Sequence, residues 1–166
     1  MNMIIYSIYW AFLITACYFD ITRLIIPNWI SLAILALFFV HAALNGVAPN
    51  DIALKLLCGM AFLVAGYILY RFQLFGGGDV KLLASCMTMI GFAHAAPLLI
   101  WMSLIGAAIA AGKVTWFVIM HRELDFRTRL RNALAVELPY GVAIAGAAML
   151  TSPVQPFGLA FGISTF

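Results

Sequence analysis

Charged residues are scarce in this sequence, and their scarcity excludes a soluble domain. Asp, Glu, Lys and Arg make up 9% of the 166 residues and hydrophobic residues make up 66%. An ordinary soluble domain has about a quarter of its residues charged. The formal net charge of +3 is too small to indicate nucleic-acid binding. The composition therefore predicts an integral membrane protein whose partner is the lipid bilayer and whose few charges report its topology.

Cysteine and histidine are also few, and neither occurs at a metal-binding spacing. The three cysteines lie inside apolar segments and form no C-x-x-C pair, which predicts buried core positions and not a zinc site or a disulfide framework. The three histidines show no H-x-x-x-H or H-E-x-x-H spacing. We therefore expect no metal and no cofactor.

Long apolar runs predict an all-α, polytopic membrane protein with about six transmembrane helices, in one membrane-embedded domain over residues 1–166. The expected spans are residues 3–19, 29–44, 52–70, a short span from 80 that fades between 91 and 97, 98–120, and 139–151. The charged stretch 121–138 has leucines every four residues and predicts an amphipathic helix on the membrane surface.

Positive charges predict the orientation of these spans. They gather in or beside the loops after spans one, three and five, whereas only Lys55 lies near an opposite loop. The positive-inside rule places the first group of loops in the cytoplasm, with both termini on the other side. The residues concerned are Arg23, Arg71, Lys81, Arg122, Arg127, Arg129 and Arg131.

One stretch interrupts the apolar sequence with three glycines and a carboxylate. Residues 71–81 read R-F-Q-L-F-G-G-G-D-V-K, so that Asp79 falls at or just inside a bilayer boundary. A charge carried to the bilayer centre costs roughly 2.5 to 3.5 kcal/mol, so the presence of an acid here requires a functional or structural explanation. The glycines leave a backbone against which another chain segment can lie. The structural alternative is a turn followed by an Asp N-cap on the next helix.

A second carboxylate, Asp20, ends the first span and is poorly placed for stability. A negative side chain at a helix C-terminus opposes the helix dipole by some tenths of a kcal/mol to about 1 kcal/mol. The predicted topology puts Asp20 and Asp79 at the same membrane face, where they can meet. The other acids sit in polar loops or have basic neighbours at helical spacing, and they need no function to explain them: Asp51, Glu123, Asp125 and Glu137.

Two carboxylates within hydrogen-bonding reach cannot both ionise easily, so one keeps a proton while the other acts as a base. Such a pair hydrolyses peptide bonds by activating a water molecule between the two acids. Partial burial at the membrane edge is expected to keep the half-ionised pair populated near neutral pH. The pair titrates as a unit, and the sequence leaves open which aspartate holds the proton.

Three blocks in order resemble a known family. Gly76-Gly77-Gly78-Asp79 fits the G-x-G-D motif of membrane aspartic proteases, and Val80-Lys81 with the upstream D-I-T-R-L-I-I-P-N looks like the type IV prepilin peptidase branch. The block Pro139-Tyr140-Gly141 is similar to the short members that process Flp (tight-adherence) pilins. The resemblance covers nearly the whole chain.

The resemblance implies an aspartic endopeptidase of the bacterial inner membrane that cuts the leader from Flp-type prepilins at the cytoplasmic face. It implies that Asp20 and Asp79 are catalytic. Residues expected to bind substrate or shape the site are Gly76, Gly77, Gly78, Lys81, Arg23, Pro27, Asn28, Pro139, Tyr140 and Gly141. The longer members carry a cysteine-tetrad region between their first helices and methylate the new pilin N-terminus. This chain has no such region between its first helices, so the sequence leaves open whether it carries out any methylation.

Several alternatives stay open at this point. Snorkelling or turn formation explains Arg23, Pro27, Asn28 and Lys81 equally well. Lys113 either sits near the aspartate pair or snorkels to the membrane surface, and snorkelling is favoured. The competing function is a non-enzymatic membrane protein, such as a small ion-coupled transporter or a pilus-assembly scaffold, whose aspartates bind a cation.

Overall fold

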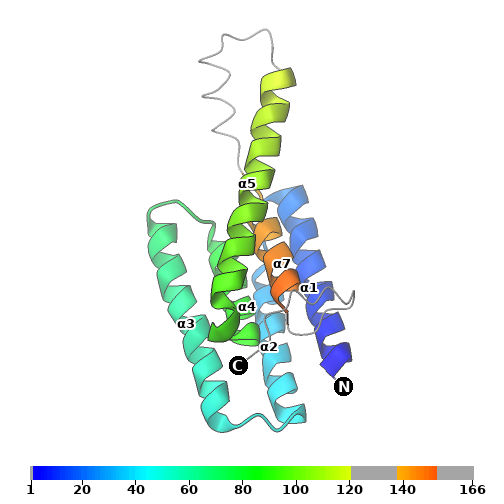
Figure 1. The fold of residues 1–166 in the computed structure, drawn as a ribbon, viewed down its shortest axis with the longest axis vertical. Helices are drawn as coiled ribbons and strands as arrows, with labels where there is room; N and C mark the ends of the chain where they lie inside the picture. The colour runs from blue at the N-terminus through cyan, green and yellow to red at the C-terminus, as the bar shows by residue number, and fades with distance from the viewer. Residues whose placement is uncertain (1, 121–137, 153–166) are drawn as a thin grey trace.

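The computed structural model describes residues 2–120 and 138–152, and these residues form a bundle of helices (Figure 1). The described part contains no strand, which confirms the all-α prediction. Its α-helices are α1 (Asn2–Arg23), α2 (Asn28–Leu44), α3 (Pro49–Arg71), α4 (Gly77–Ile90), α5 (Ala95–Met120) and α7 (Tyr140–Thr151), with a short 3-10 helix, η1 (Phe92–His94), before α5.

Three of these helices are long and apolar enough to cross a membrane: α1, α3 and the continuous helical region Phe92–Met120. The helices α2 and α7 are apolar but shorter. These helices are those of a membrane protein, and the count of six spans stays a prediction. The surface helix predicted over 121–138 lies outside the described residues, apart from Leu138.

Helix boundaries differ from the predicted spans where local geometry takes over from hydropathy. The helix α1 continues one turn past the predicted end at residue 19, so that Asp20 lies inside its last turn. The short span predicted from residue 80 ends at Ile90, because Gly91 takes a left-handed φ of +83° that stops the helix. The chain then turns through η1 into α5.

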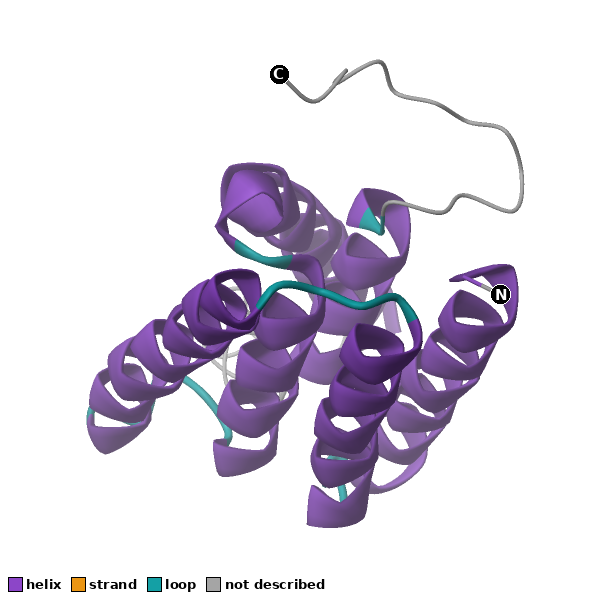
Figure 2. Ribbon diagram, turned by 90° about the horizontal axis from the view of Figure 1, so that it is seen from below, coloured by secondary structure: helices purple, strands orange, loops and turns teal. Residues whose placement is uncertain are grey.

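The helix α4 is the centre of the bundle. It contacts α2, α3 and α7, and every residue from Leu82 to Ile90 is buried. Figure 2 shows the helices side by side, viewed along the bundle. At 1.5 Å per residue its 14 residues extend only about 21 Å. The hydroxyl groups of Ser85 and Thr88 need no water molecule as a hydrogen-bond partner, because they donate to backbone carbonyl groups of α4 itself.

Glycines on α3 allow α4 to pack closely against it. A Cβ atom on Gly66 would lie 2.7 Å from Cγ1 of Val80, and one on Gly59 would lie 2.9 Å from the carbonyl oxygen of Ala84 and against the Thr88 hydroxyl. Atoms cannot approach so closely without displacement. The close α3–α4 contact therefore depends on the missing side chains, as it does between many membrane helices.

The termini that carry the polar residues gather at one end of the bundle. The C-termini of α1 and α3 and the N-termini of α2, α4 and α7 all lie there, towards the top of Figure 1. Two residues in this region have a left-handed backbone without being glycine: Leu24, with φ of 52°, and Gln73, with φ of 58°. Such conformations are uncommon and are often found at functional sites.

A matched pair of glycine substitutions tests the α3–α4 contact. We expect Gly59→Ala to lower the free energy of unfolding by about 1 to 3 kcal/mol, because the methyl group overpacks the helix interface. Gly112→Ala is the control, since nothing lies within 4 Å of a Cβ at Gly112. Thermal unfolding of the detergent-solubilised variants measures both. Equal stability of the two variants would show that α3 and α4 do not pack as described.

Candidate active site

Asp20 and Asp79 line the same hollow at the polar end of the bundle. Both border two adjoining cavities of about 710 and 220 Å³, here together called the carboxylate cavity. The two side chains are nearly buried, with 4% and 9% of their surface exposed. The fold therefore brings together two acids from distant parts of the chain, on α1 and α4.

The Asp20 carboxylate is held by the N-terminus of α7. The backbone N–H of Val142 donates to Oδ2 of Asp20 at 3.1 Å, and the N–H of Gly141 also interacts with the carboxylate. A helix N-terminus carries a partial positive charge that favours an anion. This contact offsets the unfavourable position of Asp20 at the C-terminal end of its own helix.

Two glycines make room for this contact. A Cβ on Gly141 would lie 2.9 Å from Cγ of Asp20 and 2.5 Å from Cδ1 of Ile26, and a Cβ on Gly78 would lie 3.1 Å from Cβ of Ile26. Ile26 is buried in the loop after α1, where it is wedged between the starts of α4 and α7. Residue 141 must therefore lack a side chain for α7 to reach Asp20.

Asp79 lies inside the first turn of α4 and is not its N-cap. The N-cap is Gly76, and its backbone N–H donates to Oδ2 of Asp79 at 3.3 Å. The structural alternative, in which Asp79 is the N-cap residue, is therefore wrong, because Gly76 holds that position. The Asp79 carboxylate nevertheless satisfies one free N–H of the helix terminus. A Cβ on Gly76 would lie 2.8 Å from the same Oδ2 atom.

Charges act across the carboxylate cavity. Asp20 lies close enough to Asp79 for the two carboxylates to repel each other, and the ammonium group of Lys113, on α5, attracts Asp20. Lys113 is half-buried. The structure thus places the charge of Lys113 within electrostatic range of Asp20.

Aromatic and apolar residues form the rim of the cavity. The rings of Phe75 and Tyr140 pack at a centroid distance of 5.4 Å and an interplanar angle of 31°. Tyr70 and the left-handed residues Leu24 and Gln73 also line it. The sequence singled out Tyr140 but not the other four, because isolated residues at a helix end or in a loop carry no motif. Their exposure to the cavity follows only from the fold.

Other residues proposed from the sequence are not among those that line the carboxylate cavity. The Arg23 guanidinium stands 5.4 Å from the ring centroid of Phe19. Pro27 and Pro139 are the N-caps of α2 and α7. Asn28 and Lys81 meet each other in a separate groove, described below. Within the described residues no group of three His, Cys, Asp or Glu side chains is arranged to hold a metal ion.

Comparison with known proteins identifies the family. The model of the type IV leader peptidase family matches residues 7–111, which include α1 to α4, both aspartates and most of α5. The chain therefore belongs to the type IV leader peptidase family, as its motifs predicted. It is a member of a peptidase family built from membrane helices. No curated protein and no solved structure gave a significant match.

Gly141→Ala tests whether α7 positions the Asp20 carboxylate. On the catalytic role that we propose below for Asp20, we expect a loss of leader-peptide cleavage of about 10²-fold, because displacing a reacting group by about 1 Å can cost that much. Cleavage of a prepilin in isolated membranes measures the loss. The control on the same helix is Gly146→Ala, whose Cβ would meet only the end of the Ile105 side chain at 3.1 Å. Full activity of Gly141→Ala would mean that this contact does not position Asp20.

Proposed function

We propose that this protein is an aspartic endopeptidase that removes the leader peptide from Flp-type prepilins at the cytoplasmic face of the inner membrane, with Asp20 and Asp79 as its catalytic pair. The observation that supports this most strongly is the meeting of two buried carboxylates from α1 and α4 in one cavity. Membership of a leader peptidase family makes a prepilin the natural substrate.

The reaction follows from the arrangement of the two acids. Ionised Asp20 takes a proton from a water molecule, and the water oxygen attacks the carbonyl carbon of the peptide bond. Protonated Asp79 gives its proton to the carbonyl oxygen, which avoids an exposed negative charge on the tetrahedral intermediate. When the C–N bond breaks, the proton on Asp20 passes to the leaving amine. Asp79 recovers a proton from the intermediate's hydroxyl group, and the pair is restored.

Hydrogen bonds support this division of roles. Asp20 accepts from the N-terminus of α7 and lies near the ammonium group of Lys113, and both interactions favour the charged form. Asp79 accepts a single, longer hydrogen bond from Gly76 and faces the negative charge of Asp20. Two carboxylates this close share one proton, and that proton therefore resides on Asp79.

The charge distribution supports the cytoplasmic orientation. Arg23 ends α1, Arg71 ends α3 and Lys81 lies in the first turns of α4, so all three stand at the end of the bundle that contains the carboxylate cavity. Positively charged residues are enriched on the cytoplasmic side of membrane proteins. The scissile bond is then cut at the inner surface of the membrane.

Substitution of either aspartate tests the proposed function. We expect Asp20→Asn and Asp79→Asn each to lower the rate of prepilin cleavage at least about 10³-fold, because each removes one of the two proton-transfer groups. Asp51→Asn is the control, since Asp51 is an exposed acid at the start of α3. Expression and membrane insertion are measured alongside cleavage. Full cleavage by Asp20→Asn or Asp79→Asn ends the protease assignment.

Conservative Asp→Glu changes separate catalysis from cation binding. Asp20→Glu and Asp79→Glu are expected to be as inactive as the Asn variants, because the added methylene moves the carboxylate by about 1 Å. A site that merely bound a cation between flexible carboxylates would tolerate the longer side chain. Near-normal turnover of both Glu variants in the same membrane assay would therefore favour the cation-binding alternative.

Chemical labelling tests which aspartate holds the proton. A hydrophobic carbodiimide reacts with a protonated carboxyl group, whereas a small epoxide is attacked by an ionised one. At neutral pH we expect the carbodiimide to modify Asp79 and the epoxide to modify Asp20, as mapped by mass spectrometry of the labelled peptides. In Lys113→Gln, carbodiimide labelling of Asp20 should rise because a nearby positive charge is lost. The reverse labelling pattern would exchange the two roles.

A further inference from the structure

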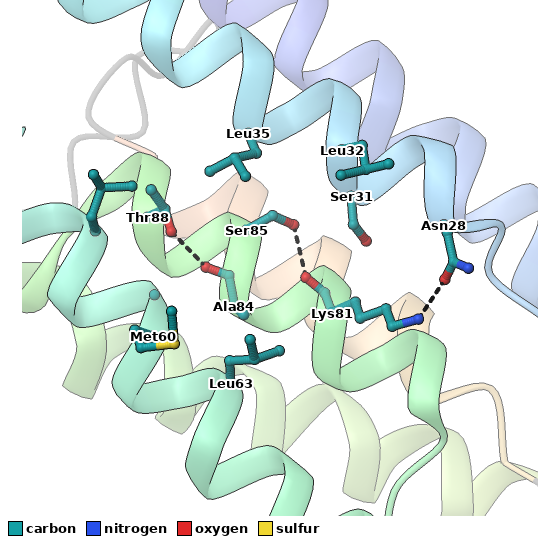
Figure 3. A pocket seen from close by; sticks show the side chains of 12 residues that line it. Asn28, Ser31, Leu32, Leu35, Met60, Leu63, Lys81, Ala84, Ser85 and Thr88 are labelled. Atoms are coloured by element: carbon teal, nitrogen blue, oxygen red, sulfur yellow. Dashed lines mark hydrogen bonds between the residues drawn. The ribbon is translucent and has the colours of Figure 1, made fainter.

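A second hollow, the α2–α3 groove, lies on the opposite side of α4 from α7. Its volume is about 420 Å³, and residues of α2, α3 and α4 line it, including Leu35, Met60 and Ser85 (Figure 3). The helix α4 forms the floor, and α2 and α3 form the walls. Leu32 and Met60 on the walls are 64% and 57% exposed. The groove therefore opens sideways, towards the surface that a bilayer would cover.

The groove is apolar inside even though hydroxyl groups line it. Ser85 donates to the carbonyl oxygens of Lys81 and Leu82, and Thr88 donates to that of Ala84. Figure 3 shows two of these bonds turned back onto α4. Because these hydroxyl groups are satisfied within their own helix, the floor offers an occupant carbon surface and little hydrogen bonding.

One end of the groove carries a positive charge that has no negative partner among the described residues. Nζ of Lys81 donates to Oδ1 of Asn28 at 2.8 Å (Figure 3), and no carboxylate lies within ion-pair distance of it among the described residues. Asn28 is neutral, so the bond orients the ammonium group and leaves its charge uncompensated. A charged group that faces an apolar groove at membrane level indicates a functional contact.

The groove is linked to the carboxylate cavity by shared lining residues. An intermediate cavity of about 460 Å³ lies beside the first turns of α4. Leu63 and Lys81 line both this cavity and the groove, whereas Tyr70 lines both this cavity and the carboxylate cavity. A path along the protein surface therefore leads from the two aspartates, past Tyr70 and Lys81, into the apolar groove.

We propose that the α2–α3 groove holds an apolar segment of the substrate polypeptide that adjoins the scissile bond, and that Lys81 pairs with an acidic side chain on this segment. The inference rests on the proposed function and adds the part of the substrate bound outside the carboxylate cavity. A membrane lipid fits the groove alone, but only a polypeptide accounts for the continuous path to the aspartates. The unpaired ammonium group supplies the charge complementarity.

Photo-crosslinking tests which molecule occupies the groove. Benzoylphenylalanine replaces Met60 in the Asp79→Asn enzyme, which is co-expressed in membranes with an epitope-tagged Flp-type prepilin. Illumination is expected to join the enzyme to the apolar segment of the prepilin. The control replaces Leu54, which is on the same helix, is similarly exposed at 56%, and does not line the groove. Adducts with lipid alone, or equal prepilin capture from both positions, would overturn the proposal.

Kinetics of Lys81 variants test the charge contact. Lys81→Met is expected to raise KM for the prepilin about tenfold and to leave kcat unchanged, because the contact is made equally in the ground and transition states. Lys81→Arg should restore most of the affinity. A fall in kcat alone would instead place Lys81 in catalysis, and an unchanged KM would remove it from substrate binding; either result contradicts this contact.

Cleavage by the wild-type enzyme separates failure of this inference from failure of the proposed function. The same tagged prepilin is first incubated with wild-type membranes. If it is cleaved but the Met60 position captures no prepilin, the groove assignment is wrong and the peptidase assignment stands. If it is not cleaved, the proposed function fails, and capture from Met60 but not from Leu54 still shows that the groove binds the polypeptide.

Discussion

The contact between the N-terminus of α7 and the Asp20 carboxylate is the interaction on which the site depends. An acid at the end of α1 is unfavourable by itself, and a buried carboxylate needs donors or an opposite charge. The helix α7 supplies N–H donors and also the positive end of its helix dipole. It reaches Asp20 only because residue 141 has no side chain. The lack of a side chain at residue 141 thus allows the Asp20 carboxylate to be buried in an apolar bundle, and it fixes the orientation of that carboxylate.

Asp79 is held in a different way, and in the proposed mechanism this difference separates the roles of the two acids. It folds back onto the N-cap of its own helix and has one backbone donor, while the neighbouring Asp20 disfavours a second negative charge. Two acids in unequal surroundings are what a general acid and a general base require. The short, buried α4 also separates the carboxylate cavity from the α2–α3 groove. A substrate in both places would pass around the first turn of this helix.

The sequence predicted the features that depend on residue type and spacing. Apolar runs located every described α-helix to within a few residues, and the positions of Asp20 and Asp79 at span ends placed them at one face. The G-x-G-D block and the stretch after Asp20 indicated the type IV leader peptidase family, which the comparison over residues 7–111 confirms. The sequence also raised two interpretations of Lys113, and the fold adds that its charge acts on Asp20.

Contacts between residues far apart in the chain were not predictable in this way. The wedge of Ile26 between Gly78 and Gly141, and the donation from Val142 to Asp20, use an ordinary apolar residue and a backbone group. Neither has a sequence signature. The family resemblance assigns Lys81 and Asn28 to substrate binding or site shaping without placing them in space. The fold puts both in the α2–α3 groove, where Lys81 donates a hydrogen bond to Asn28.

Binding of a transition-state analogue tests the central claim most directly. In a prepilin cleavage-site peptide with a hydroxyethylene group in place of the scissile bond, the hydroxyl takes the position of the attacking water between the two acids. Such analogues bind about 10² to 10⁸-fold more tightly than substrates when a site is complementary to the transition state. The account predicts tight binding to the wild-type enzyme and a large loss of affinity in both Asp20→Asn and Asp79→Asn. Wild-type affinity in either variant would contradict a shared water between these two aspartates.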